Sequence, residues 1–334
     1  MESVENVLGQ LRKQFPDVRV HVFDVQAEAQ QAGRLVLTGR VLDETVRGAM
    51  RSAFQEQMPG VPVEDSGVRV LRRQPAQMFS VATNLTGLYG EPSFSSEMVS
   101  ELMYGWPVEM LEERSNWVFV RQPDGYLGWA YRPYLTQAAA PQPTHLVIDP
   151  VQPVHAAPDG GSAVLTRILA GMSLRCLAVE GEWACVAANQ QGWVPASALR
   201  ALDALPHQAD ERRQRMAADA QRMIGVPYLW GGCSANGIDC SGLAQLVHRW
   251  VGIPVLRDAD MQYNGGRPVE YPFRPGDLLF FGEKGEKRRI THVTISLGDW
   301  DIIHSSRSRN GVYIDNVQSV EHLRSDFLFG CTYL

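Results

Sequence analysis

An internal repeat occupies the middle of this chain and limits what the chain can fold into. The first copy reads EMVSELMYGWPVEMLEERSNWVFVRQPDGYLGWAYRPYL, and the second reads AVLTRILAGMSLRCLAVEGEWACVAANQQGWVPASAL. One glycine and two tryptophans recur at nearly constant spacing: Gly105 and Gly171, Trp117 and Trp183, and Trp129 and Trp193. Two self-similar units of about 65 residues predict two copies of one domain. Each copy contains short, strand-like runs of alternating apolar and polar residues, separated by turn residues. This pattern predicts a small β-barrel over residues 73–138 and another over residues 139–203.

Length and composition exclude several classes of protein. The chain has 334 residues and a formal net charge of −6, from 31 Lys and Arg against 37 Asp and Glu. This length exceeds one ordinary core, and the acidic balance argues against nucleic-acid binding. No apolar run is long enough for a membrane span and the N-terminus lacks a secretory pattern, so we expect a cytoplasmic protein with no membrane partner. The five scattered cysteines form no disulfide framework.

Residues 1–72 are expected to form a small α/β domain. An apolar stripe that begins at Val4 predicts a first helix, and Asp43 is the expected N-cap of a second one. Three strands are expected, at Val18–Val25, Arg34–Leu42 and Val68–Leu71. The pattern resembles the BON domain, a small α/β module. We find no group of catalytic side chains in this segment, so a structural or docking role is expected.

Residues 204–334 have a different pattern. ADERRQRMAADAQRMIG is a helix candidate, a glycine-rich loop follows it, and LAQLVHRWVG is a second helix that ends at Gly252. The segments RPGDLLFFG, ITHVTISL and DIIHSS are then expected to be strands, the last two joined by a turn at Gly298–Asp299. Helices followed by several strands predict an α+β domain, so the whole chain is expected to be a multidomain α+β protein.

Cys240 is the candidate nucleophile of the C-terminal segment. It lies in IDCSGL, directly before an expected helix. A helix N-terminus presents unpaired N–H groups and the positive end of the dipole, and both favour a thiolate over a thiol. The alternative is a buried structural cysteine, which is the usual fate of this residue type. The polar, glycine-rich loop around Cys240 favours an accessible sulfur and therefore the nucleophile.

Two histidines follow that are suited to acid–base chemistry. A cysteine hydrolase needs a base that takes and returns a proton, and His292 is the candidate. In a hairpin centred on Gly298, His292 and His304 should be cross-strand neighbours, which would place an orienting group beside the base. The alternatives are two surface-strand histidines, or a metal site formed with the cysteine. Because no fourth ligand has a zinc-like spacing, nucleophilic catalysis is favoured and no metal is expected.

At these residues the sequence resembles the NlpC/P60 cysteine peptidases. The resemblance rests on PYLWGGCSANGIDCSGLAQLVHRWVG, RPGDLLFF and HVTISLGDWDIIHSS. It implies a papain-like domain in which Cys240 is the nucleophile, His292 the base and His304 the residue that orients the base. It further implies roles in substrate binding for three residues that surround the nucleophile: Tyr228, Asp239 and Ser241. No cofactor is implied.

The repeat resembles the bacterial SH3 domain, a small barrel often joined to cell-wall hydrolases. Two such copies before an NlpC/P60 domain are similar to the γ-D-glutamyl-L-diamino-acid endopeptidases of murein recycling. In that subfamily, the first SH3-like domain receives the free amine of an N-terminal L-alanine. The resemblance assigns this role to Glu97 and Tyr126, and Glu97 together with Asp239 would supply the charge that an ammonium needs. The alternatives are an ordinary exposed carboxylate and a strand-surface aromatic ring.

The function expected from the sequence is therefore hydrolysis of the γ-D-Glu–diamino acid bond in a murein peptide. One alternative is a non-catalytic wall-binding protein that uses its paired SH3-like domains. Another keeps the NlpC/P60 fold but performs acyl transfer or cleaves a different amide. The sequence leaves open the choice between lysine and diaminopimelate, the oligomeric state and the role of residues 1–72.

Overall fold

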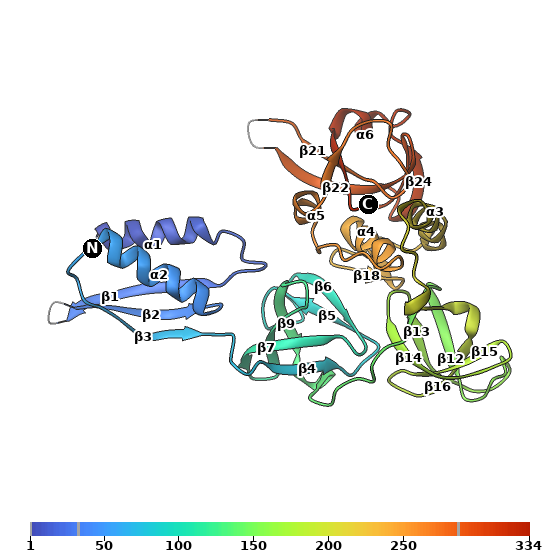
Figure 1. The fold of residues 1–334 in the computed structure, drawn as a ribbon, viewed down its shortest axis with the longest axis horizontal. Coiled ribbons are helices and arrows are strands. Elements are labelled where there is room, and N and C mark those ends of the chain that lie inside the picture. The colour runs from blue at the N-terminus through green and yellow to red at the C-terminus, as the bar shows by residue number, and fades with distance from the viewer. Residues whose placement is uncertain (1, 32–33, 286–287) are drawn as a thin grey trace. The chain divides into compact units, whose positions relative to one another are not determined.

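The computed structural model describes residues 2–31, 34–285 and 288–334. The chain divides into two compact units. Figure 1 labels the helices and strands along the chain. The first unit consists of Met1–Phe79, Glu91–Ser93 and Pro107–Pro133. The second unit consists of Ser80–Gly90, Phe94–Trp106 and Tyr134–Leu334. Each unit is described here by itself.

The first unit begins with two helices and a three-stranded sheet. The elements are α1 (Glu2–Gln14), β1 (Phe23–Gln31), β2 (Arg34–Val41), α2 (Glu44–Gln57) and β3 (Val63–Val70). β1 pairs with β2 in antiparallel and β2 with β3 in parallel fashion. The Asp43 side chain accepts hydrogen bonds from the backbone N–H groups of Thr45 and Val46, so the structure agrees with the expected N-cap. The first strand starts later than expected, because Asp17 accepts hydrogen bonds from Arg19 and holds the preceding segment in a turn.

The repeat appears as matching sets of short strands. The first copy contains β4 (Gln77–Val81), β5 (Leu85–Tyr89), β6 (Met98–Met103), β7 (Pro107–Arg114), β8 (Trp117–Arg121), β9 (Leu127–Tyr131) and β10 (Leu135–Thr136). The second contains β11 (His145–Val147), β12 (Val151–His155), β13 (Val164–Leu169), β14 (Ser173–Glu180), β15 (Trp183–Ala187), β16 (Gly192–Pro195) and β17 (Leu199–Ala201). The pairings β4–β10, β5–β6, β7–β8 and β8–β9 recur as β11–β17, β12–β13, β14–β15 and β15–β16.

The repeated tryptophans have the same register in both copies. Trp129 lies opposite Phe119 in the first copy, and Trp193 lies opposite Cys185 in the second. Phe119 and Cys185 are both the third residue of their strands. The sequence repeat is therefore a repeat of the strand ladder itself.

The C-terminal part of the second unit is an antiparallel sheet with helices on both faces. Its sheet has the order β20-β25-β21-β22-β23-β24. The strands are β20 (Arg267–Val269), β21 (Leu278–Glu283), β22 (Arg289–Gly298), β23 (Asp301–Ser306), β24 (Gly311–Asn316) and β25 (Phe327–Thr332). The helices are α3 (Ala209–Ala220), α4 (Cys240–Arg249), α5 (Ala259–Gly265) and α6 (Glu321–Asp326), and a small hairpin joins β18 (Cys233–Ser234) to β19 (Gly237–Ile238).

Two apolar clusters hold this sheet between its helices. On one face, Leu243 and Val247 of α4 pack with Val293 and Ile303 of the sheet. On the other face, Leu323 of α6 packs in a cluster with other strand residues, including Leu279, Phe281 and Ile302. Through the first cluster, α4 packs against β22. No helix in the described part of the chain is both long and apolar enough to cross a membrane.

Candidate active site

The candidate nucleophile is the first residue of α4. Asp239 precedes it as the N-cap, and its carboxylate accepts a 2.7 Å hydrogen bond from the backbone N–H of Gly242. A side chain at Gly242 would collide with the carbonyl oxygen of Gly232, so glycine is required where the loop crosses the helix start. The helix predicted after Cys240 is present, and its cap holds the preceding loop against it.

The electrostatic surroundings of the Cys240 sulfur differ from the expectation. Burial and the neighbouring Asp239 charge raise the pKa of the Cys240 thiol to about 12, although the backbone N–H groups of Val293 and Ser241 donate to the sulfur. This direction is opposite to the lowered thiol pKa expected at a helix N-terminus. The reason is that the Asp239 carboxylate occupies the helix N-terminus and offsets its dipole, while the surrounding core removes water.

The two candidate histidines lie on adjacent strands and contact each other. Nε2 of His292 on β22 and Nδ1 of His304 on β23 are 2.8 Å apart. They are diagonal neighbours, because Ser296 pairs with Ile302 and this register puts His304 opposite Thr294. The expectation that they are near cross-strand neighbours is confirmed. The register is two residues away from one centred on Gly298, because the hairpin turns at Asp299 and Trp300. Diagonal neighbours remain within reach of long side chains.

Burial keeps both imidazoles neutral. It lowers the pKa of His292 to about 4 and, together with the neighbouring His292, that of His304 to about 2. Cys240 lies next to β22, close to the backbone N–H of Val293, which is the residue after His292. Within the described residues, no hydrogen bond joins the Cys240 sulfur to His292 directly. The resting arrangement is a neutral thiol beside a neutral base.

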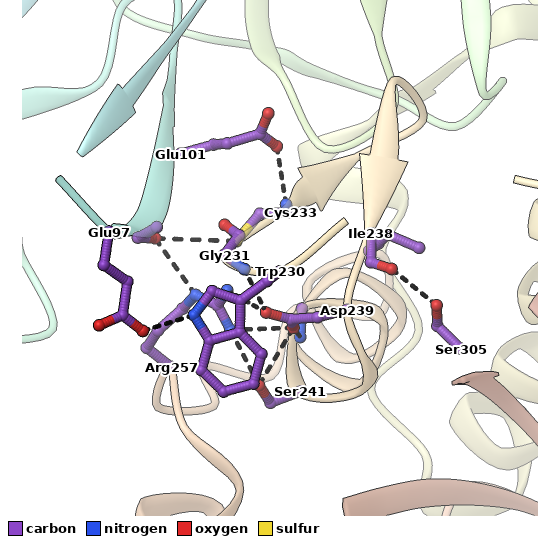
Figure 2. A network of polar contacts seen from close by, with 12 residues as sticks. Glu97, Glu101, Trp230, Gly231, Cys233, Ile238, Asp239, Ser241, Arg257 and Ser305 are labelled. Atoms are coloured by element: carbon purple, nitrogen blue, oxygen red, sulfur yellow. Dashed lines mark hydrogen bonds and ion pairs between the residues drawn. The ribbon is translucent and has the colours of Figure 1, made fainter. Parts of the chain in front are cut away.

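Tyr228 and Trp230 line the loop that leads to the nucleophile. Burial, followed by the Cys240 and Asp239 charges, raises the pKa of Tyr228. The exposed indole of Trp230 donates from Nε1 to Oε1 of Glu97 over 2.6 Å (Figure 2). The guanidinium of Arg307 lies 5.4 Å and 5.3 Å from the Tyr228 and Trp230 rings. Glu97, from the segment before β6, is therefore part of this loop region.

Arg257 organises the polar groups behind the nucleophile. Its guanidinium contacts both Asp239 oxygens, at 3.1 Å and 2.6 Å, and donates to the Ser241 hydroxyl at 2.8 Å (Figure 2). Although burial opposes the charge, the Asp239 carboxylate holds the pKa of Arg257 well above its ordinary value. Asp239 also accepts from the N–H of Gly231. The Asp239 charge is thus already paired within the protein.

A second buried carboxylate joins β6 to the nucleophile loop. Oε2 of Glu101 accepts a 2.7 Å hydrogen bond from the backbone N–H of Cys233, as Figure 2 shows. Two residues earlier in the loop, a side chain at Gly231 would collide with the Met98 carbonyl oxygen. Burial raises the pKa of Glu101, and the Cys233 N–H only partly opposes this effect. β6 and the loop are therefore in close contact at Gly231, where a side chain would not fit.

We expect Glu101→Gln to flatten the pH dependence of stability. A raised carboxyl pKa means that the native protein loses stability as pH rises above about 4.5, where the unfolded carboxyl ionises. The glutamine would keep an acceptor for the Cys233 N–H without ionising. The free energy of unfolding of this variant should exceed that of the wild type at pH 8, and the gap should narrow as the pH falls toward 4. Chemical denaturation at several pH values measures this, with exposed Glu270→Gln as control. A constant gap would contradict the prediction.

The structure brings most of the expected site residues into one region. Cys240, Asp239, Ser241, Tyr228, Glu97, His292 and His304 all belong to the second unit. Tyr126 belongs to the first unit, where its side chain is buried at the turn before β9, and its role in substrate binding stays a prediction. Sequence reasoning assigned no role to Glu101, Arg257 or Asp315, a carboxylate 3.3 Å from His304. The sequence offered one signal for Asp315, namely a carboxylate next to the apolar residues of β24.

Comparisons with known proteins confirm the family resemblance. Residues 225–326 match the family model described as NlpC/P60 family, and residues 88–130 match the one described as Bacterial dipeptidyl-peptidase Sh3 domain. The first range includes Cys240, His292 and His304, and the second includes Glu97 and Tyr126.

Three similar proteins extend this result over most of the chain. Dipeptidyl-peptidase 6 of Lysinibacillus sphaericus is 28% identical over 256 residues, covering 71% of this chain and 90% of that protein. A gamma-D-glutamyl-L-lysine dipeptidyl-peptidase of Bacillus cereus is 27% identical over 248 residues, covering 66% and 71%. The crystal structure of an NlpC/P60 family protein from Bacillus cereus has a TM-score of 0.67 at 20% identity and covers 77% of this chain and 99% of its own. This structural likeness concerns the fold.

Proposed function

We propose that this chain, which contains an NlpC/P60 domain and a bacterial SH3 domain, is a cysteine endopeptidase that hydrolyses the γ-D-Glu–diamino acid bond of murein peptides with a free N-terminal L-Ala. The observation that carries the proposal is the joint placement of three groups. Cys240 starts α4 against the strand of His292, and Glu97 contacts the loop that precedes the nucleophile. Two relatives carry names that specify γ-D-glutamyl-L-lysine peptides.

The proposed reaction starts from the neutral Cys240 thiol and the neutral His292 imidazole. The Cys240 sulfur attacks the amide carbonyl carbon while His292 takes the thiol proton, so charge develops only as the new C–S bond forms. The backbone N–H at the start of α4 stabilises the oxyanion. His292 then returns the proton to the leaving amine as the C–N bond breaks. Water, deprotonated by His292, finally attacks the thioester and releases the acid and the thiol.

Glu97 is the proposed anchor for the substrate amine. One of its oxygens accepts the Trp230 N–H, and the side chain remains exposed. Its carboxylate can therefore pair with an ammonium, whereas the charge of Asp239 is already compensated by Arg257. A peptide still attached to the glycan has its L-Ala amine in an amide and offers no such charge. The proposal therefore favours released peptides and a role in recycling.

We expect Glu97→Gln to lower kcat/KM for a free L-Ala-γ-D-Glu-diamino acid tripeptide by roughly 10- to 150-fold. A charge-assisted hydrogen bond of about 1.5–3 kcal/mol is lost, and 1.4 kcal/mol corresponds to a factor of ten. For the N-acetylated tripeptide the same variant should match the wild type, because the partner charge is already absent. Mass spectrometry of the products measures both rates and identifies the cleaved bond.

The same assay includes intact sacculi and an exposed control, Glu270→Gln. Equal losses on free and acetylated peptides would show that Glu97 does not bind the amine. Comparable turnover of sacculi and free tripeptide would contradict the preference for released peptides. Cleavage at another bond would overturn the substrate assignment while leaving a cysteine hydrolase.

A further inference from the structure

A buried carboxylate lies behind the two histidines, on the side away from their mutual hydrogen bond. Oδ2 of Asp315 on β24 is 3.3 Å from Nε2 of His304, and Oδ1 accepts a 2.7 Å hydrogen bond from Arg309. The Asp315 side chain is 9% exposed and that of His304 is 1% exposed. His292, His304 and Asp315 therefore form a line of hydrogen-bonding groups across three adjacent strands.

The order of donors and acceptors along this line follows from simple chemistry. A neutral imidazole carries one N–H, and a carboxylate can only accept. Because Asp315 accepts, His304 must carry its proton on Nε2, and its Nδ1 then has a lone pair. That lone pair must accept from Nε2–H of His292, so the remaining nitrogen of His292, Nδ1, is unprotonated. Without the carboxylate, the His292–His304 hydrogen bond could run in either direction.

We propose that Asp315 is a positioning residue that sets the tautomers of both histidines and thereby makes Nδ1 of His292 the proton acceptor. The assignment of His292 as base rests on the proposed function, whereas the tautomer assignment does not. When His292 takes the thiol proton, it becomes an imidazolium that keeps its Nε2–H bond to His304. The Asp315 carboxylate, which Arg309 also contacts, still accepts from Nε2–H of His304 and so holds the line in this order while His292 is protonated.

The variant Asp315→Asn tests whether Asp315 affects the rate of the reaction. The asparagine has nearly the same shape, but its amide can donate as well as accept and therefore permits both tautomers. We expect kcat for the tripeptide to fall by about 10- to 100-fold with KM nearly unchanged, because Asp315 acts on the proton acceptor and has no place in substrate binding. Asp301→Asn is the matched control, since it removes the same charge from β23 at an exposed carboxylate that contacts Asn316.

The imidazole ¹⁵N chemical shifts test the tautomers without any substrate. In the wild type at pH 7 we expect Nε2–H on both His292 and His304, and in Asp315→Asn a mixture with Nδ1–H. Nδ1–H on either histidine of the wild type would overturn the proposal even if the variant failed to fold. A fall in kcat with unchanged tautomers, or an unchanged kcat, would also overturn it. If no murein peptide were cleaved, the proposed function would fail while the shifts still decided the tautomers.

Discussion

Replacing Cys240 with alanine is expected to abolish hydrolysis of the tripeptide, with kcat/KM falling by about four to six orders of magnitude. The variant removes the only atom proposed to form the covalent intermediate, and loss of a nucleophile has effects of this size in hydrolases with an analogous mechanism. Folding should be preserved, because the change removes a single sulfur atom and Asp239 still caps α4. The rate of product formation, followed by mass spectrometry, measures the loss.

Cys176→Ala is the matched control for this experiment. Cys176 lies on β14 of the second repeat copy and, like Cys240, is partly exposed. Its removal should leave kcat/KM within a factor of two, roughly the spread of surface substitutions. Residual turnover by Cys240→Ala within tenfold of the wild type would show that another group is the nucleophile. Equal losses in the two variants would point to a general effect of thiol removal.

The second large effect concerns stability. Arg257→Met should lower the free energy of unfolding by about 3–5 kcal/mol, since it leaves the buried Asp239 carboxylate without its charge partner. The calorimetric transition that contains the NlpC/P60 domain should shift down by about 6–20 °C. Methionine keeps much of the length and apolar volume of the arginine, so the shift reports the charge and its hydrogen bonds.

A double-mutant cycle separates charge from packing. Asp239→Asn combined with Arg257→Met should recover part of the lost stability, because no unpaired charge then remains. Arg274→Gln removes a guanidinium from an exposed ion pair with Asp210 and should change the free energy of unfolding by less than about 0.5 kcal/mol. Similar shifts in Arg257→Met and Arg274→Gln would mean that the buried pair contributes no more than a surface pair.

Structural elements that depend only on residues close together in the chain could be predicted from local sequence patterns. The spacing of Trp117 and Trp129 against Trp183 and Trp193 anticipated a shared strand ladder, because side-chain alternation and turn positions are local properties. The cap at Asp43 was predicted for the same reason. The ordered motifs around Cys240 and the two histidines were specific enough to indicate the family.

Properties that depend on burial and distant partners required the tertiary structure. The hairpin register differed by two residues because the turn lies at Asp299 and Trp300 instead of being centred on Gly298, which the spacing of His292 and His304 does not reveal. The pKa of Cys240 is raised although a helix start alone would lower it, because the core excludes water and Asp239 supplies the opposing charge. Asp315 lies on β24, the strand next to that of His304, and its contact with His304 depends on the register of the two strands.

The sequence by itself thus predicted which side chains carry the chemistry, and the tertiary structure showed their burial and their partners. Glu97 shows the difference clearly. The family resemblance selected it, but only the fold shows that Asp239 is paired with Arg257 and that the Glu97 carboxylate contacts Trp230. The physical reason is that the free energy of a charge depends on its desolvation and on the charges within a few ångströms, and both are set by residues far apart in the chain.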